Sequence, residues 1–159
     1  MTTEWSAEFN WPDSQVDLIE GKNRITLDMG PGALDALSLK LEMQRRLRDR
    51  ETNLDFFLVD EDEIKDQTFQ LLNSERLETS LGCLETLPVE RVRKNSTRYT
   101  RGWHAPALEY ITVRMEHGKT DGDHMEMRIS ELILDGKTVE PKPGCAALQF
   151  SQENTGAQP

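Results

Sequence analysis

The sequence contains only two cysteines, Cys83 and Cys145, among 159 residues. Their separation matches no zinc-binding or redox motif, and two isolated cysteines are typical of free thiols in a reducing compartment. The N-terminus has no basic region followed by an apolar run, so we expect no signal peptide. We therefore predict two free thiols and a cytoplasmic location.

Long apolar runs are missing as well. No segment approaches the ~18 consecutive apolar residues that a membrane-spanning helix requires, so we expect no association with a membrane. Only 36% of the residues are hydrophobic, but part of this shortfall lies in polar tails and acidic stretches. The length still suits one domain with a hydrophobic core.

Basic residues are scarce. The 19 Lys and Arg stand against 29 Asp and Glu, which gives a net charge of −10. This balance argues against nonspecific binding to nucleic acid or anionic membranes, and it leaves open a basic partner or a mimic of nucleic acid. The charge is also unevenly placed: residues 51–90 contain eleven acidic and two basic residues, whereas residues 91–101 contain five basic residues and no acidic ones.

Established catalytic and cofactor motifs are absent from the sequence. There is no zinc-protease helix motif, no paired CxxC, no nucleophile elbow and no dinucleotide fingerprint. Two Gly-Lys-Thr triplets, at 118–120 and 136–138, resemble the end of a phosphate-binding loop. Both lack its earlier glycine and fall in expected hairpin turns. We therefore expect no cofactor, and the sequence favours a non-enzymatic protein over an enzyme.

The most informative stretch runs from residue 109 to residue 139 and predicts a β-hairpin lying on the core. A loop over 118–122 places apolar residues opposite one another on one face and opposite charges, such as Arg114 and Glu126, on the other. A slip of one residue would lose both faces at once. The apolar pairs in this register are Ile111 with Ile129, Val113 with Met127, and Met115 with Met125.

Local turn signals predict further hairpins, and helical spacing predicts three helices. Gly21-Lys22 suits a two-residue turn between Val16 and Leu27, and Asp135-Gly136 is a type I′ turn signal. Four arginines between 45 and 50 cluster at the end of the first helix, where they would complement its dipole or, alternatively, hold phosphate. The acidic run 60–63 suits the start of the second helix better than a calcium loop. Leu77, Leu81 and Leu84 follow the spacing of the third.

We predict an α+β fold with one domain over residues 15–150. An aromatic arm over 1–14 would precede the domain, and a disordered tail over 151–159 would follow it. The antiparallel sheet would come from residues 15–29, 54–59, 89–103, 107–139 and 146–150. The helices near 33–50, 61–73 and 75–86 would pack against this sheet.

Segregated charge and aromatic residues carry the functional prediction. Arginines and aromatics between 91 and 103 could follow a phosphate backbone and stack bases, or they could pair with the acidic 51–90 stretch, which we favour. We predict a non-enzymatic interaction or assembly subunit with a protein partner or a second copy of itself. A nucleic-acid-related role, as a binder or an acidic mimic, is the alternative. The candidate partner-binding residues are Trp5, Phe9, Trp11, Arg91, Arg93, Lys94, Arg98, Tyr99, Arg101 and Trp103.

A small metal-dependent enzyme is the second alternative. Histidines and carboxylates gather around one end of the main hairpin, and both are ligands of transition metals. The predicted register separates two of the histidines onto opposite faces, so this site is not favoured. Its candidate ligands are His104, His117, Asp121, Asp123 and His124.

Overall fold

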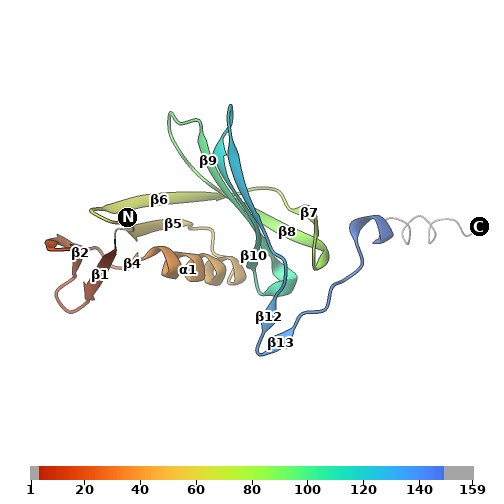
Figure 1. The fold of residues 1–159 in the computed structure, drawn as a ribbon, viewed down its shortest axis with the longest axis horizontal. Coiled ribbons are helices and arrows are strands. Elements are labelled where there is room, and N and C mark those ends of the chain that lie inside the picture. Colours follow the sequence, from red (N-terminus) through yellow and green to blue (C-terminus); the bar gives the residue numbers. More distant parts are fainter. Residues whose placement is uncertain (1–3, 149–159) are drawn as a thin grey trace, which may run out of the picture. The chain divides into compact units, whose positions relative to one another are not determined.

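The computed structural model describes residues 4–148. The fold is mostly β, so the predicted α+β fold with three packed helices is wrong. Figure 1 shows the strands and the helix α1, which is the one longer helix within residues 4–148. The chain divides into two compact units, Met1–Thr68 and Phe69–Pro159. The prediction of one domain over 15–150 stays a prediction.

The first unit contains a three-stranded antiparallel sheet and a second group of strands. The first sheet has the order β1 (Trp5–Asn10), β2 (Gln15–Glu20) and β3 (Asn23–Asp28). The predicted hairpin is confirmed, because Val16 lies opposite Leu27 and Gly21 has a φ of +60° at the turn. In the second group β4 (Ala33–Leu34) runs parallel to β5 (Asp55–Val59), which pairs with β6 (Ile64–Leu71). The core consists of Val16, Leu18, Met29, Ala33 and Val59.

The helix α1 (Ala36–Arg48) confirms the centre of the first predicted helix. Its first turn is capped by Asp35, whose carboxylate accepts a hydrogen bond from the Ser38 amide at 2.7 Å. Such a cap satisfies one of the free N–H groups at a helix start. The helix buries its apolar stripe, which consists of Leu39, Met43 and Leu47.

The other two predicted helices are strands. Residues 61–73 contain β6, and residues 75–86 contain β7 (Glu75–Thr79) and the start of β8 (Gly82–Arg91). Leu77 lies directly opposite Leu84 across the β7–β8 hairpin, and Leu81 lies in the turn between the strands. The leucine spacing that imitates a helix therefore arises across a hairpin, where two apolar strand positions and one turn position meet.

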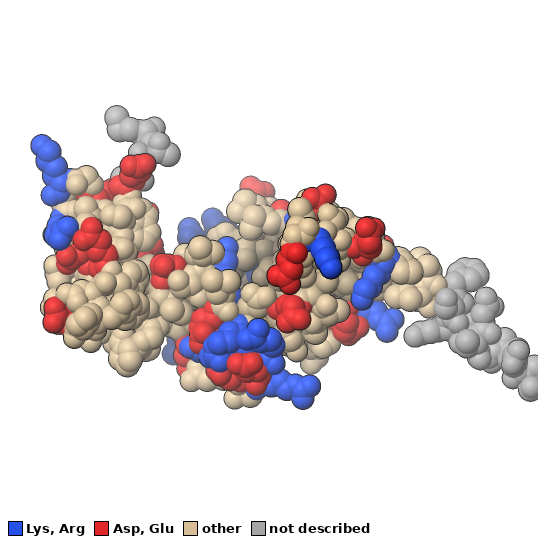
Figure 2. Space-filling view, turned by 90° about the horizontal axis from the view of Figure 1, so that it is seen from below, with Lys and Arg blue, Asp and Glu red and all other residues tan. Residues whose placement is uncertain are grey.

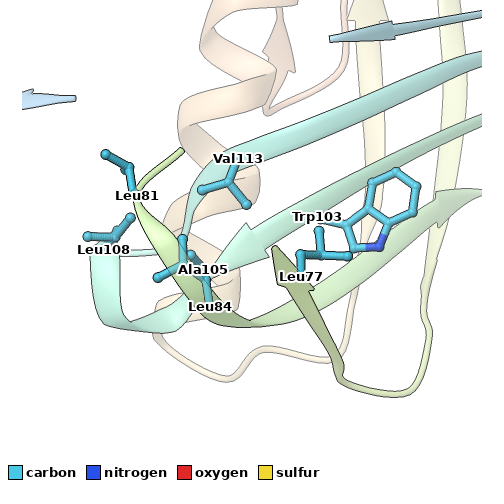
Figure 3. Close-up of a cluster of buried hydrophobic side chains, with 7 residues drawn as sticks. All are labelled: Leu77, Leu81, Leu84, Trp103, Ala105, Leu108 and Val113. Atoms are coloured by element: carbon cyan, nitrogen blue, oxygen red, sulfur yellow. The ribbon is translucent and has the colours of Figure 1, made fainter. Parts of the chain in front are cut away.

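The second unit is an antiparallel sheet around its own core. Its strands follow the order β11 (His124–Arg128), β10 (Ile111–Lys119), β9 (Arg98–Ala105) and β8, and β7 also pairs with β8. Pro106–Leu108 forms a short 3-10 helix, η1. Figure 3 shows the buried side chains of the core, which come from β7, β8, β9, η1 and β10 and the β7–β8 turn: Leu77, Leu81, Leu84, Trp103, Ala105, Leu108 and Val113.

The main hairpin forms, but its register differs from the prediction by two residues. Met115 lies opposite Met127 and Gly118 lies opposite His124. The pairing of β10 with β9 shifts between Thr112 and Arg114, so side chains before and after Val113 alternate with opposite phase. Val113 therefore reaches the core, whereas the methionines leave it, and Met125 is 60% exposed. The predicted apolar face on the core is wrong for β11.

The predicted turn at Asp135-Gly136 is confirmed. Both residues have positive φ, +50° and +76°, as a type I′ turn requires. They join β12 (Ile133–Leu134) to β13 (Lys137–Thr138). Residues 145–148 are helical and not the predicted strand, while the rest of that strand and the tail over 151–159 lie outside the described residues. No helix in the described range 4–148 is long and apolar enough to span a membrane.

Cys83 and Cys145 form a disulfide, so the prediction of two free thiols is wrong. The bond holds a segment around residue 143 against the β7–β8 hairpin, and we call residues 139–145 the strap. The Cys83 amide donates to the Pro143 carbonyl at 3.0 Å, and the Lys142 amide donates to the Leu81 carbonyl at 2.9 Å. Backbone pairing and a covalent bond thus fix the same part of the chain.

Candidate binding surface

Four basic residues gather at the end of the β8–β9 hairpin. Arg91 is the last residue of β8 and Arg98 is the first of β9, with residues 92–97 between the strands. Arg98 lies opposite Lys119 of β10, and the Thr120 amide donates to the Thr97 carbonyl at 2.9 Å. The ends of two hairpins therefore lie side by side. We call Arg91, Arg93, Lys94 and Arg98 the basic hairpin end.

The basic hairpin end has no acidic partner among the described residues. None of its cations lies within 4.0 Å of a carboxylate in the part of the chain that the structure describes, residues 4–148. The ion pairs of the preceding acidic stretch go elsewhere: Lys65 bonds Asp60, and Arg76 bonds Glu85. Within residues 4–148, ion pairing of the basic strip with the acidic 51–90 stretch is limited to Arg101, which bonds Glu90.

Arg93 shows the electrostatic consequence of this arrangement. Burial lowers the pKa of its guanidinium, and the positive charges of Arg91 and Arg98 lower it further. Its only side-chain hydrogen bond in the described structure goes to the Thr100 hydroxyl at 3.2 Å, and its Nε is buried without a partner. A group of like charges of this kind is stabilised by any anion that binds between them.

The aromatic residues of the strip are occupied within the molecule. Trp103 is 2% exposed and donates from Nε1 to Glu75 at 3.0 Å. The Arg114 guanidinium lies over its ring, 4.5 Å from the centroid. The Tyr99 hydroxyl donates to Glu116 at 2.7 Å, and this bond raises the pKa of Tyr99. The Trp103 ring is therefore buried and offers no free face for stacking, and the Tyr99 hydroxyl is held within the sheet.

The N-terminal aromatics belong to β1 and the turn after it. β1 is an edge strand that pairs with β2 along its whole length. Phe9 packs against the core of the first unit and stacks on Trp11 at 5.3 Å between ring centroids. Trp11 is 56% exposed and Trp5 is 37% exposed. Of the three predicted anchors, the two tryptophans are therefore the more accessible.

The histidines are not brought together. His104 is buried and its Nδ1 lies 2.9 Å from the Tyr110 carbonyl oxygen, while His117 bonds the Thr100 hydroxyl at 2.7 Å. Within residues 4–148 the one set of metal-ligand side chains that converges is Glu78, Cys83 and Cys145. Two of its members are joined in the disulfide, and Glu78 accepts a hydrogen bond from the Cys145 amide at 2.6 Å.

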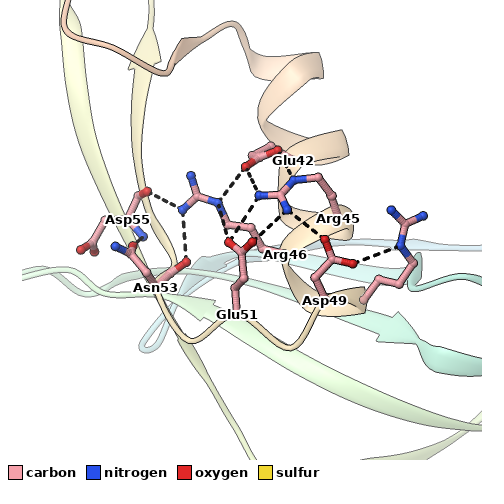
Figure 4. Close-up of polar contacts among 8 residues, drawn as sticks. Glu42, Arg45, Arg46, Asp49, Glu51, Asn53 and Asp55 are labelled. Atoms are coloured by element: carbon pink, nitrogen blue, oxygen red, sulfur yellow. Dashed lines mark hydrogen bonds and ion pairs between the residues drawn. The ribbon is translucent and has the colours of Figure 1, made fainter.

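The arginines at the end of α1 neutralise local carboxylates, as Figure 4 shows. Arg45 bonds Glu42, Asp49 and Glu51 at 2.7 to 2.9 Å. Hydrogen bonds from Arg45 are the main cause that lowers the pKa of Glu42 to about 2. Arg46 also bonds Glu42 and donates to the backbone carbonyls of Asn53 and Asp55. Arg45 and Arg46 are therefore not free to hold phosphate.

Charged side chains elsewhere on the surface also lie beside groups of the opposite charge. On the face shown in Figure 2, Lys and Arg side chains lie next to Asp and Glu. A groove of about 550 Å³ between β7 and the strand ends of β10 and β11 is lined by Leu77, Val113 and three arginines, Arg76, Arg114 and Arg128. Arg76 pairs with Glu85 and the other two arginines pair with Glu126, so the groove offers less free charge than the basic hairpin end.

Searches of family models, curated proteins and solved structures find no match to this chain. The candidate surface therefore depends on the chain's own geometry. Sequence reasoning found its four cations from their composition. It missed the neighbouring Lys119, because only the observed register places that residue opposite Arg98.

Proposed function

We propose that this protein is a non-enzymatic interaction subunit that binds an acidic surface of a protein partner through the basic hairpin end. The observation that supports this proposal is the absence of carboxylate partners for Arg91, Lys94 and Arg98 among the described residues. The paired arginines elsewhere show that this chain can neutralise its cations when they serve its own stability. Unpaired cations on one hairpin end favour an external anion.

A protein partner fits this surface better than nucleic acid does. Sequence-independent binding of single strands uses a basic groove together with exposed aromatic faces on which bases stack. Here Tyr99 and Trp103 are held by Glu116 and Glu75. The net charge of −10 also opposes approach to a long polyanion, whereas a local acidic patch meets only the local cations.

Charge neutralisation tests the proposal. We expect the protein to bind a fluorescent polyglutamate peptide, and the combined variant Arg91→Gln, Lys94→Gln, Arg98→Gln to bind it at least about tenfold more weakly. Lys22→Gln, Lys40→Gln, Lys137→Gln is the matched control, because it removes the same charge from exposed positions elsewhere. Binding is measured by fluorescence anisotropy over a range of salt concentrations.

Three results would overturn the proposal. Equal loss in the control variant would show that only the net charge matters. Absence of binding by the unchanged protein would show that the basic hairpin end is not an anion-binding site. Tighter binding of a single-stranded oligonucleotide than of polyglutamate, with a steep salt dependence, would replace the protein partner with nucleic acid.

A further inference from the structure

The outer edge of β11 is open in the described structure. β11 pairs with β10 on one side only. The Ile129 amide donates to the Val113 carbonyl at 2.9 Å, which shows that odd-numbered residues direct their backbone groups toward β10. The backbone N–H and C=O groups of Glu126 and Arg128 therefore point away from the sheet. They form a row of groups to which another strand can pair.

β11 is only partly protected as an edge strand. Natural edges are blocked by charged side chains, above all lysine, and by proline, bulges or very short length. β11 has the sequence His-Met-Glu-Met-Arg, which contains no proline, no lysine and no bulge against β10, so its protection is limited to the charges of Glu126 and Arg128. Its two methionines are 60% and 52% exposed. An exposed apolar face thus accompanies the open backbone edge.

The charges on the other face of β11 are incompletely matched. Arg114 lies directly opposite Arg128, and Glu116 lies directly opposite Glu126. The structure offsets this repulsion with two ion pairs of Glu126, a diagonal one with Arg114, whose Nε lies 2.9 Å away, and one with Arg128 on the same strand. Arg128 remains 72% exposed and shares its one carboxylate partner with Arg114. A strand added at this edge is favoured if it brings a carboxylate opposite Arg128.

We propose that two copies of this chain associate by antiparallel pairing of their β11 strands, with Met127 opposite Met127 of the second copy. Outward-facing backbone groups pair only when even-numbered residues oppose even-numbered residues. Among such registers, one centred on Glu126 opposes two carboxylates and one centred on Arg128 opposes two guanidinium groups. The register centred on Met127 places Glu126 opposite Arg128 twice, so charge selects it.

The same register joins the apolar faces of the two copies. Met127 meets its own counterpart, and Met125 meets Ile129. The symmetric contact uses one surface twice, which is the commonest form of dimer. A contact along a single strand edge is small, so association should depend on protein concentration in the way of weak complexes. This inference is independent of the basic hairpin end, because β11 contributes none of its four cations.

A pair of complementary variants tests both the surface and the register. Met127→Lys and Met127→Glu each place like charges opposite each other across the two-fold axis. Each variant alone should therefore associate about tenfold more weakly than the unchanged protein. An equal mixture should recover association as a heterodimer, because lysine then meets glutamate. Sedimentation equilibrium over a range of concentrations measures the average mass in each case.

Ile133→Lys and Ile133→Glu are the matched controls, because Ile133 is an exposed apolar residue outside β11, at 57% exposure. Both controls should associate like the unchanged protein, and circular dichroism should show that all four variants fold. The inference is overturned if the unchanged protein remains a monomer at every concentration. It is equally overturned if the Met127 variants associate normally, or if mixing them restores nothing.

Discussion

His104 is a buried titratable residue in a tight part of the backbone. Its ring lies against the Tyr110 carbonyl, next to two consecutive residues, Glu109 and Tyr110, that have positive φ values of +56° and +61°. A positive φ is unfavourable for residues other than glycine. Burial lowers the pKa of His104, although the hydrogen bond to Tyr110 opposes this shift. The neutral imidazole is therefore the form that the fold requires.

The lowered pKa of His104 predicts a loss of stability in acid. Protonation favours the unfolded chain, where the pKa is near its ordinary value, so the free energy of unfolding should fall as the pH drops below about 6.5. His104→Gln keeps a hydrogen-bond donor but cannot titrate, so it should lose part of this pH dependence. Urea unfolding at about pH 7.5 and about pH 5 measures the difference. The exposed His124→Gln is the control, and an unchanged pH dependence in His104→Gln would contradict the prediction.

Gly82 is a second residue on which the local structure depends. Its φ is +97°, and a Cβ at this position would lie 2.2 Å from the Lys142 carbonyl oxygen of the strap. Gly82→Ala should therefore cost about 3 kcal/mol, from backbone strain and from displacement of the strap. Gly136→Ala is a matched control, because Gly136 has a φ of +76° with nothing within 4 Å of its Cβ position. It should lose only about 1 kcal/mol. Equal losses in thermal unfolding would show that the strap does not press on Gly82.

At the scale of elements, the sequence predicts structure where local chemistry decides it. The turns at Gly21 and Asp135-Gly136 need positive φ, and these residues accept it, so both hairpins are found correctly. α1 is found because helical spacing and the basic end of the helix are local features, but the face is misplaced: Leu39, Met43 and Leu47 are buried, whereas Leu37 and Leu41, which lead the predicted stripe, are exposed. Periodicity fails at Leu77, Leu81 and Leu84, where the same spacing fits a helix and a hairpin.

Register and nonlocal contacts explain the remaining errors. In the main hairpin, the shift at Val113 reverses the alternation of faces, and no residue type there signals it. The disulfide joins residues separated by 62 positions, so a local pattern cannot predict it. The sequence predicts the cations of the candidate surface, because the basic residues at 91–98 follow one another closely in the chain. Their lack of partners depends on where Glu90, Glu75 and Glu116 come to lie.

The disulfide is the feature that acts at the scale of the whole molecule. Closing a loop of 62 residues removes conformational entropy from the unfolded chain, worth about 4 kcal/mol in the loop-entropy model. The free energy of unfolding of the combined variant Cys83→Ser, Cys145→Ser should therefore be lower by about this amount.

The disulfide also bears on the expected cytoplasmic location, because a reducing compartment keeps such bonds reduced. Thiol trapping in intact cells measures whether the bond exists there, and a trapped disulfide would contradict that location.

The same variant tests whether the chain is one domain over 15–150. The disulfide lies in the second unit, whereas β2 lies in the first. β6 pairs with β5 through residues 64–68 and with β8 through residues 69–71, so unfolding either partner strand leaves part of β6 unpaired. We therefore expect loss of the disulfide to reduce amide protection in β2 and β9 to the same extent. Hydrogen exchange followed by mass spectrometry reports each strand separately. Loss of protection in β9 with β2 unchanged would mean that the two units unfold independently, and the single domain would have to be divided at β6.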